Sequence, residues 1–327
     1  MIKNQDILNI EIGVVGLGLM GSSIVVALLI SGHPVKGIAP KKNDMKDALP
    51  RIIDQLKHAE ACGLLERPIE AYLERLTLSE DYHHLKDCQL VQECVTEVEE
   101  IKGEVYQKIV AATGMNTIIS SNTSAIPISI LQKLVPNPSR FMGVHWAEPA
   151  YMTRFLEITK GEQTAEDGAR WVLELAHFWD KEPTFLRKDI RGFVTNRLMY
   201  AVYREIFHLI ENGETTVEDA DKSFRYDAGS WMTFMGVFQR MDQLGLEDFA
   251  EAFGRIFPTL CNSDKVPLLM QRMVEAKARG IQNQRGLYSY TAGEAQEWER
   301  SFAAFNEDIY HLASAYSPTR KKKQFHE

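Results

Sequence analysis

The chain has 327 residues, of which 45% are hydrophobic and 25% charged, and its formal net charge is −8 at pH 7. This composition is typical of a soluble globular protein of about two domains, and the acidic balance excludes a basic face for nucleic acid. The four cysteines have neither CxxC nor metal-ligand spacing, which favours a reduced, cytoplasmic location with no metal site.

An uncharged segment over residues 12–32 reads IGVVGLGLMGSSIVVALLISG. By length and apolarity alone it is a candidate for a membrane-spanning helix. Within it, however, Gly16, Gly18 and Gly21 have the spacing G-x-G-x-x-G, after a β-branched run over 12–15 and before a helix predicted over 22–30. In that order the glycines allow a tight turn, close approach of a pyrophosphate and close packing of helix on strand. We therefore predict dinucleotide binding and no membrane association.

After this turn, apolar strands alternate with helical segments. Strands are predicted over residues 33–39, 77–79, 88–94, 117–121, 141–146, 155–159 and 182–186. Helices are predicted over residues 43–66, 69–76, 98–112, 127–134 and 164–179. The alternation predicts an α/β fold with a mostly parallel sheet that helices cover on both faces.

The pattern changes near residue 189, where strand signals almost end. Helices are predicted over residues 191–212, 217–225, 231–244, 246–256 and 267–278, with one further strand over 287–290. The sequence therefore predicts a dinucleotide-binding domain over 1–190 and an all-α domain over 191–317. The remaining residues, 318–327, contain the basic run 320–323 and are predicted to be a disordered tail.

Four polar residues fall where ligands bind in open parallel sheets, near strand ends or at a helix start: Ser124, His145, Glu157 and Asn196. A neutral imidazole takes a hydroxyl proton as a hydride leaves the carbinol carbon, and a carboxylate fixes its tautomer. A hydroxyl and an amide hold the substrate oxygen where charge develops. Taken singly, each residue also fits a structural role, such as a turn, a helix start or a surface position.

In the order of its motifs the chain resembles the L-3-hydroxyacyl-CoA dehydrogenase family, from the glycine turn to about Tyr290. The similar segments are GLGLMG over 16–21, ECVTE over 93–97 with Lys102, SNTS over 121–124, His145 with Glu157, and GFVTNR over 192–197. The resemblance implies a Rossmann-type domain and oxidation of a 3-hydroxyacyl-CoA, or a related 3-hydroxy acid, to the 3-keto product with hydride transfer to NAD. It also implies a role in fatty acid metabolism and a homodimer paired through the helical domain.

The resemblance assigns roles to individual residues. His145 would be the general acid/base, Glu157 its orienting partner, and Ser124 and Asn196 the groups that bind the substrate oxygen. The residues expected to contact the cofactor are Gly16, Gly18, Leu19, Met20, Gly21, Ala39, Lys41, Glu97, Lys102 and Asn122.

The chain departs from the family pattern after its histidine. The family usually has an aromatic pair followed by Asn-Pro, whereas this chain has Trp146, Ala147, Glu148 and Pro149. Glu148 is therefore a candidate substrate-binding acid. It would attract a cationic group or favour the protonated form of His145. The alternative is a rim residue that points to water.

A second departure concerns the cofactor. The second strand of NAD enzymes usually ends in Asp or Glu, which binds the ribose 2′-hydroxyl. Here Ala39 takes that place and Lys41 and Lys42 follow, so the local sequence favours NADP or looser selection, unless Asp44 reaches the ribose instead. The family likeness favours NAD, which we predict, without excluding NADP.

A third departure, Gly236-Val237-Phe238 in place of Gly-Pro-Phe, is consistent with a small substrate without CoA. Two alternatives therefore stay open: an NADPH-dependent keto-acid reductase that acts on a CoA-free substrate, and a nucleotide-binding sensor without catalysis.

Overall fold

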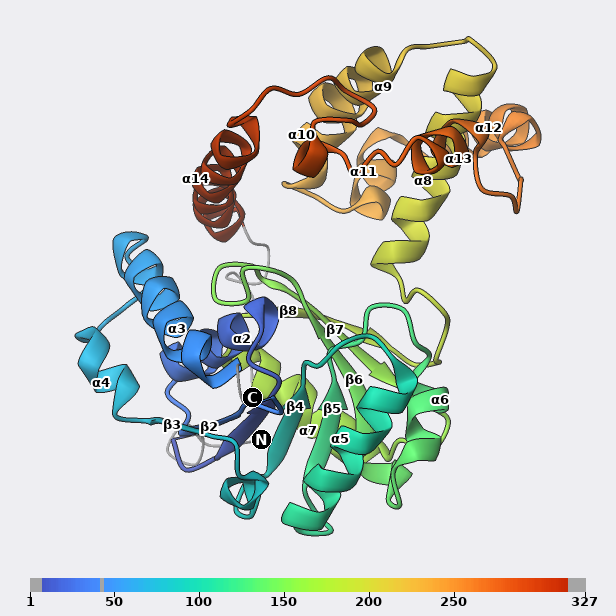
Figure 1. Ribbon diagram of the computed structural model, residues 1–327. Helices are drawn as coiled ribbons and strands as arrows, with labels where there is room; N and C mark the ends of the chain where they lie inside the picture. Colours follow the sequence, from blue (N-terminus) through green and yellow to red (C-terminus); the bar gives the residue numbers. More distant parts are fainter. Residues whose placement is uncertain (1–7, 42–43, 317–327) are drawn as a thin grey trace. The chain divides into compact units, whose positions relative to one another are not determined.

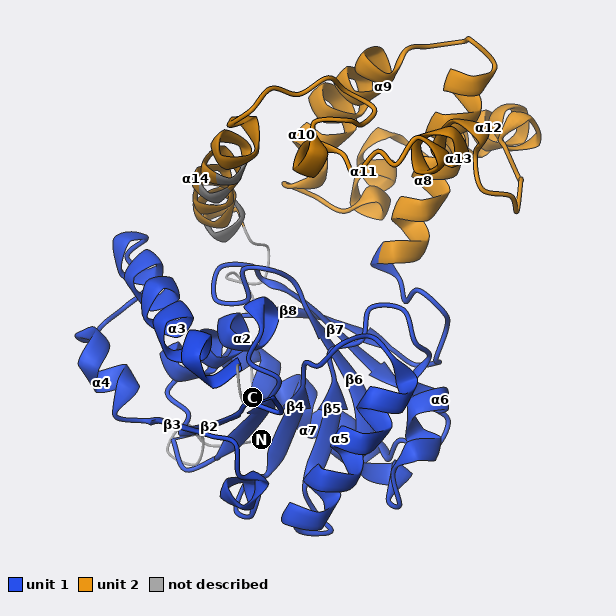
Figure 2. Cartoon of the chain, in the orientation of Figure 1, with its two compact units in different colours: residues 1–195 blue, residues 196–327 orange. Residues whose placement is uncertain are grey.

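The computed structural model describes residues 8–41 and 44–316. The chain forms two compact units, residues 1–195 and 196–327 (Figure 2). The structural division thus follows Thr195, whereas the sequence predicts a boundary after residue 190. Lys42 and the predicted basic tail over 318–327 lie outside the described residues.

The first unit is built on one eight-stranded sheet with the order β3-β2-β1-β4-β5-β6-β7-β8 (Figure 1). Its strands are β1 (Ile12–Val15), β2 (Val35–Ile38), β3 (Leu76–Ser79), β4 (Leu90–Glu93), β5 (Ile118–Ser121), β6 (Phe141–Trp146), β7 (Phe155–Lys160) and β8 (Glu182–Leu186). All neighbours are parallel except β6 and β7, which are antiparallel. The carboxyl ends of β1, β4, β5 and β6 therefore meet at one edge, where β7 begins.

Helices cover both faces of this sheet (Figure 1). They are α2 (Leu19–Ile30), α3 (Asp44–Ala61), α4 (Ile69–Leu73), α5 (Glu99–Ala112), α6 (Ile128–Leu131) and α7 (Glu166–Phe178), with short 3-10 turns at Tyr82–Leu85, Gln132–Leu134 and Pro138–Arg140. Successive strand residues point to opposite faces, so Val14 joins the core under α2 and α7 while Val15 joins the core under α5 and α6. The order of strands and helices is that of a Rossmann-type domain.

The uncharged segment over 12–32 forms β1, the glycine turn and α2, so the membrane-span alternative is wrong. In the part of the chain that the structure describes, no helix has the length and apolarity needed to cross a membrane.

The second unit is helical. Its elements are α8 (Thr195–Glu211), α9 (Val217–Ser223), a π-helical turn (Phe224–Ala228), α10 (Gly229–Met232), α11 (Val237–Leu244), α12 (Leu246–Ile256), a 3-10 turn (Phe257–Thr259), α13 (Leu268–Glu275), a 3-10 turn (Ile281–Asn283) and α14 (Glu294–Ala315). None of the helices from α8 to α13 contains a buried residue. The described residues of this unit therefore form no closed core.

Two sequence predictions for the second unit are wrong. The helix predicted over 231–244 is interrupted, because α10 ends at Met232 and α11 begins after Gly236, whose backbone is extended (φ −72°, ψ 161°). The strand predicted over 287–290 makes only an isolated bridge between Arg285 and Ser289, since no described strand pairs with it. Helix α14 was not predicted.

The start of α8 also differs from its predicted start at residue 191. Gly192 and Phe193 have positive φ angles of 79° and 50°, so the backbone is left-handed there and the right-handed helix begins only at Thr195. This turn leads the chain out of the first unit.

Candidate active site

The glycine turn joins β1 to α2 at the carboxyl edge of the sheet. Gly16 has a φ of +97°, which favours glycine, and a Cβ on Gly21 would lie 1.8 Å from the carbonyl oxygen of Gly16. A Cβ on Gly18 would meet no atom within 4 Å. Leu19, 60% exposed, and half-buried Met20 form the first turn of α2, where amide groups lack helical partners. The open space beside these amides fits a bound pyrophosphate.

The end of β2 carries no carboxylate. Ala39 is buried, and its amide donates to the carbonyl of Ser79 at 2.9 Å. Lys41 is exposed, and its carbonyl accepts the amide of Asp44 at 3.0 Å where α3 begins. In the structure, as the sequence predicts, no carboxylate stands at the end of β2, and Lys41 is exposed close after it.

A buried carboxylate, Glu93, organises the ends of β4 and β5. Its oxygens accept hydrogen bonds from Lys102 Nζ at 2.8 and 3.0 Å, Tyr106 Oη at 2.8 Å, Ser121 Oγ at 2.7 Å and the Val95 amide at 2.6 Å. The side chains of Glu93 and Lys102 are 0% and 1% exposed. Lys102, predicted to contact the cofactor, is thus enclosed by protein. Glu93 begins the family-like segment ECVTE over 93–97, but no individual role was predicted for it, although a charged residue at the end of an apolar strand is a usable signal.

Lys102 also holds Glu97, whose Oε2 lies 3.2 Å from Nζ. Glu97 Oε1 accepts hydrogen bonds from the Thr123 hydroxyl and from the Ser124 amide at 3.1 Å. Burial alone would raise the pKa of the Glu97 carboxyl, but Thr123 and Lys102 together hold it below its usual value. The turn that carries exposed Ser124 is therefore fixed by a carboxylate.

His145 and Glu157 face each other across β6 and β7, where they are register partners. His145 Nδ1 lies 3.0 Å from Glu157 Oε2, and the two side chains are 16% and 1% exposed. Phe155 and Phe193 flank the imidazole, with ring centroids at 5.6 and 5.8 Å. Asn122, which follows β5, accepts the Trp146 amide on Oδ1 at 2.8 Å beside His145. The structure therefore brings the predicted His–Glu pair together at the edge that carries the glycine turn.

The second oxygen of Glu157 binds the segment that leads into α8. Its Oε1 accepts the amides of Val194 and Thr195 at 3.2 and 3.1 Å, and the Thr195 hydroxyl at 3.3 Å. Burial raises the pKa of Glu157, but the hydrogen bonds from His145 and Thr195 outweigh it, so the pKa is below its usual value. Asn196, a predicted substrate ligand, is the next residue along the chain and the first of the second unit.

Glu148 lies on the loop after β6. Burial raises the pKa of its carboxyl from 4.5 to about 7, although a hydrogen bond from Ser23 on α2 opposes the shift. Its Oε2 is buried and has no hydrogen-bond partner among the described residues. The alternative of a rim residue that points to water is therefore wrong for this oxygen.

Lys181, for which the sequence predicts no role, binds the loop after β6. Its ammonium donates to the carbonyls of Ala150, at 2.5 Å, and Thr153, and lies 5.5 Å from the Trp146 ring centroid. Burial lowers its pKa to about 7. No sequence pattern distinguishes this lysine from a surface one.

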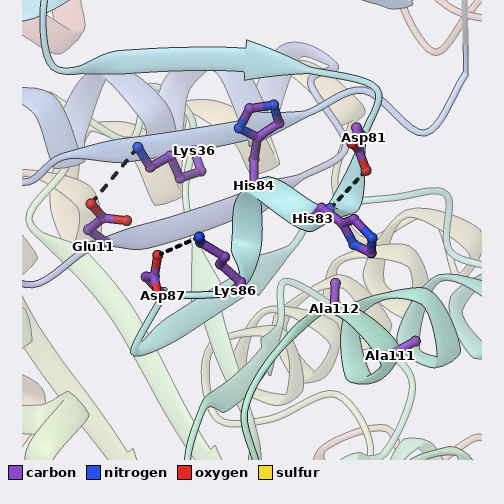
Figure 3. Close-up of a pocket in the computed structure, with 9 residues that line it drawn as sticks. All are labelled: Glu11, Lys36, Asp81, His83, His84, Lys86, Asp87, Ala111 and Ala112. Carbon is purple, nitrogen blue, oxygen red and sulfur yellow. Dashed lines mark hydrogen bonds and ion pairs between the residues drawn. The ribbon is translucent and has the colours of Figure 1, made fainter.

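A separate cavity of about 640 Å³ lies at the opposite, amino-terminal edge of the sheet (Figure 3). Its charges are mostly paired: Lys36 Nζ lies 3.9 Å from Glu11, Lys86 Nζ lies 3.7 Å from Asp87, and Asp81 accepts an amide of the adjacent 3-10 turn. Because ligands of open α/β sheets bind at the carboxyl edge, we do not assign the reaction to this cavity.

Two family models match the chain. The 3-hydroxyacyl-CoA dehydrogenase NAD-binding domain matches residues 11–190, and the 3-hydroxyacyl-CoA dehydrogenase C-terminal domain matches residues 192–290. The two matches are adjacent in sequence and leave residues 1–10, 191 and 291–327 outside them.

Individual relatives act on different compounds. A 3-hydroxybutyryl-CoA dehydrogenase of Mycobacterium tuberculosis is 30% identical over 86% of this chain and 98% of its own length. An L-carnitine dehydrogenase of Staphylococcus epidermidis is 28% identical over 95% of this chain and 96% of its own length. The 5-formyl-3-hydroxy-2-methylpyridine 4-carboxylate 5-dehydrogenase of Mesorhizobium japonicum is 29% identical over 86% of this chain and 91% of its own length.

A crystal structure of a 5-dehydrogenase of this pyridine carboxylic acid, described as an NAD+-dependent dismutase, has a TM-score of 0.86 to this chain. It is 26% identical, and the match covers 93% of this chain and 98% of that one. These similarities define the chemistry and the cofactor more closely than the substrate.

The glycine turn predicts different results for two alanine substitutions. Gly21→Ala places a Cβ against the Gly16 carbonyl and should destabilise the fold by about 3 kcal/mol or more. Gly18→Ala meets no atom of the protein, so stability should change by less than about 0.5 kcal/mol while NAD affinity falls about tenfold or more. Thermal denaturation and calorimetric titration with NAD measure the two effects. Wild-type NAD affinity in Gly18→Ala would contradict the assignment.

The raised pKa of Glu148 predicts a pH-dependent stability. Between pH 4.5 and about 7 the unfolded chain loses this proton while the folded chain keeps it, so the free energy of unfolding falls as pH rises through that window. The free energy of unfolding of Glu148→Gln minus that of wild type should therefore be about 1–2 kcal/mol larger at pH 7.5 than at pH 5, after discounting for partial solvent exposure. Denaturant unfolding of both proteins at the two pH values gives this difference. A constant difference would argue against the shifted carboxyl.

Proposed function

Because this chain belongs to the 3-hydroxyacyl-CoA dehydrogenase family, whose members are NAD-dependent enzymes that act on CH–OH groups, we propose that it oxidises a 3-hydroxyacyl substrate to the 3-keto product. The substrate is a CoA thioester, as in fatty acid metabolism, or a related 3-hydroxy acid. The observation that carries the proposal is the His145–Glu157 pair at the edge of the glycine turn.

The hydrogen bond between His145 and Glu157 sets the tautomer of the imidazole. Because the pKa of Glu157 is held low, its carboxylate is ionised near neutral pH and only accepts hydrogen bonds. The proton of a neutral His145 therefore lies on Nδ1, and Nε2 keeps its lone pair. His145 is thus prepared as a base by a group fixed to the backbone of 194–195.

NAD, when bound at the glycine turn, would accept the hydride that leaves the carbinol carbon. As the hydride leaves, His145 Nε2 takes the hydroxyl proton, and Glu157 stabilises the imidazolium that forms. Ser124 and Asn196 hold the substrate oxygen. The support for Ser124 is its turn, which Glu97 fixes, and the support for Asn196 is its position next to Thr195, which Glu157 binds.

The first experiment is a substrate and cofactor screen. Short- and long-chain 3-hydroxyacyl-CoA thioesters and their free acids are assayed with NAD and with NADP, and in reverse with the 3-keto compounds. Oxidation with NAD supports the proposal. The observation that favours the second candidate, an NADPH-dependent keto-acid reductase, is exposed Lys41 after an Ala39 without a carboxylate. A strong preference for NADPH and a free keto acid would favour it.

The proton-transfer role predicts a specific kinetic loss. His145→Ala should lower kcat on the best substrate of the screen by about 10²-fold or more, because no other group takes the proton, with NAD affinity nearly unchanged. His177→Ala, which removes an exposed histidine of α7, is the matched control and should keep wild-type kcat. Wild-type kcat in His145→Ala, with chemistry limiting the rate, would contradict the role.

We propose, in addition, that the chain is a homodimer paired through its helical unit. The helices of this unit expose large apolar side chains, with Tyr200 68%, Phe238 77%, Leu246 60% and Phe257 59% exposed, and those from α8 to α13 bury none. A helical unit gains stability by burying an apolar face, and a second copy supplies the same face by symmetry. These exposed faces support the proposal.

The dimer proposal predicts that charges on this surface dissociate the protein. Light scattering coupled to size exclusion should give twice the mass of the chain for wild type. The pair Phe238→Glu with Leu246→Glu should give a monomer, because each charge would be buried in the interface. Met115→Glu, at a residue of the first unit that is 71% exposed, is the control and should stay dimeric. A monomeric wild type at micromolar concentration would contradict the proposal.

A further inference from the structure

Phe193 combines a buried aromatic side chain with a left-handed backbone. Its side chain is 1% exposed, and its φ angle is +50°. For a bulky residue this backbone region is a genuine outlier, because the Cβ atom crowds the main chain there. Such a conformation costs free energy and persists only where the surrounding contacts hold it. The proposed reaction gives Phe193 no role, although the conformation is of the kind that gathers at functional sites.

The left-handed turn places the Phe193 ring against the catalytic base. Its ring centroid lies 5.8 Å from that of the His145 imidazole, at an interplanar angle of 46°. Phe155, the first residue of β7, lies at 5.6 Å and 87°. Two rings of different orientation therefore contact the imidazole, in addition to the hydrogen bond that Glu157 makes at Nδ1.

That hydrogen bond leaves the direction of Nε2 loosely defined. The terminal torsion of a histidine side chain is broad, and a hydrogen bond tolerates about 30° of misalignment. Glu157 therefore sets which nitrogen of His145 carries the proton, but it sets the plane of the ring less closely. Packed aromatic rings restrict that plane, because tilting the imidazole would press it into one of them.

The segment that carries Phe193 is bound to the first unit on both sides of the ring. Before it, Asp189 Oδ2 accepts the amide of Ser129 on α6 at 2.7 Å. After it, the amides of residues 194–195 donate to Glu157 Oε1 at 3.2 and 3.1 Å. The left-handed turn thus serves two contacts at once: the ring reaches the imidazole, and the amides that follow reach the carboxylate that binds the same imidazole.

We propose that Phe193 is a positioning residue that fixes the plane of the His145 imidazole, so that Nε2 is aimed at the substrate hydroxyl. The inference rests on the proposed oxidation, in which Nε2 takes the hydroxyl proton. A base must lie within hydrogen-bond reach of the proton that it removes, and a displacement of about 1 Å can lower a rate about 10²-fold. Phe193 acts through His145 and needs no contact with the substrate or with NAD.

The kinetic test removes the ring and keeps an apolar side chain. Phe193→Leu should lower kcat on the best substrate about tenfold or more, while KM and NAD affinity change by less than about threefold, because only the base is displaced. Phe141→Leu is the matched control. Phe141 is fully buried in the same core but stands at the amino-terminal end of β6, so this variant should keep wild-type kcat. If Phe193→Leu does not fold, Phe193→Met, which fills the site with a flexible side chain, takes its place.

A double-mutant cycle separates positioning from a general structural role. In the His145→Ala background, Phe193→Leu should lower kcat by less than about twofold, because the base through which Phe193 acts is absent. Three results overturn the inference: wild-type kcat in a folded Phe193 variant, an equal loss of kcat in both backgrounds, or the same loss in Phe141→Leu.

An NMR measurement tests the inference without turnover. In protein labelled with ¹⁵N-histidine, wild type should show a protected Nδ1 proton that is absent from His145→Ala, since Glu157 binds that proton. Phe193→Leu should speed its exchange with water about tenfold or more, and Phe141→Leu should leave the exchange rate unchanged.

The NMR result separates the inference from the proposed function. Unchanged exchange in Phe193→Leu, or a wild-type imidazole without a protected Nδ1 proton, overturns the positioning role whether or not the chain oxidises any substrate. Faster exchange in Phe193→Leu, with no oxidation of any substrate by wild type, supports the positioning of His145 and overturns the proposed reaction.

Discussion

The ionised carboxylate of Glu157 is the interaction on which the active site depends. It is buried in β7, so it persists as an anion only because donors surround both oxygens. One oxygen binds His145, and the other binds the backbone that leads into α8. The same group therefore sets the tautomer of the base and holds the segment that precedes Asn196. Loss of the carboxylate would disturb both at once.

Glu93 is a second buried carboxylate surrounded by hydrogen-bond donors, at the ends of β4 and β5. Lys102, Tyr106 and Ser121 donate hydrogen bonds to its oxygens. Lys102 also forms an ion pair with Glu97 and so links the two carboxylates. Glu97 in turn accepts the Ser124 amide and fixes the turn that carries Ser124. Both buried carboxylates lie at the carboxyl edge of the sheet, so the catalytic edge is held by charged hydrogen bonds as well as by apolar packing.

Much of the first unit follows from local sequence pattern. Strands β6 and β8 have their predicted bounds, and His145 and Glu157 meet because the two strands that carry them pair in an antiparallel hairpin. Other features depend on contacts that no local pattern encodes. Lys181 resembles a surface lysine in sequence, and the apolar pattern runs through the break between α10 and α11 without a signal stronger than Gly236. The segment predicted as a strand over 287–290 has apolar content but pairs with no strand in the described part of the chain.

The central claim is that Glu157 prepares His145 as the base. It is tested most directly by the rate of hydride transfer in a single turnover of Glu157→Gln with NAD and the best 3-hydroxyacyl substrate. The glutamine amide can donate to Nδ1 and so favours the tautomer with its proton on Nε2, where the substrate proton must go. The account predicts a loss of about 10²–10⁴-fold in this rate with NAD affinity unchanged. Hydride transfer at the wild-type rate in a correctly folded variant would contradict it.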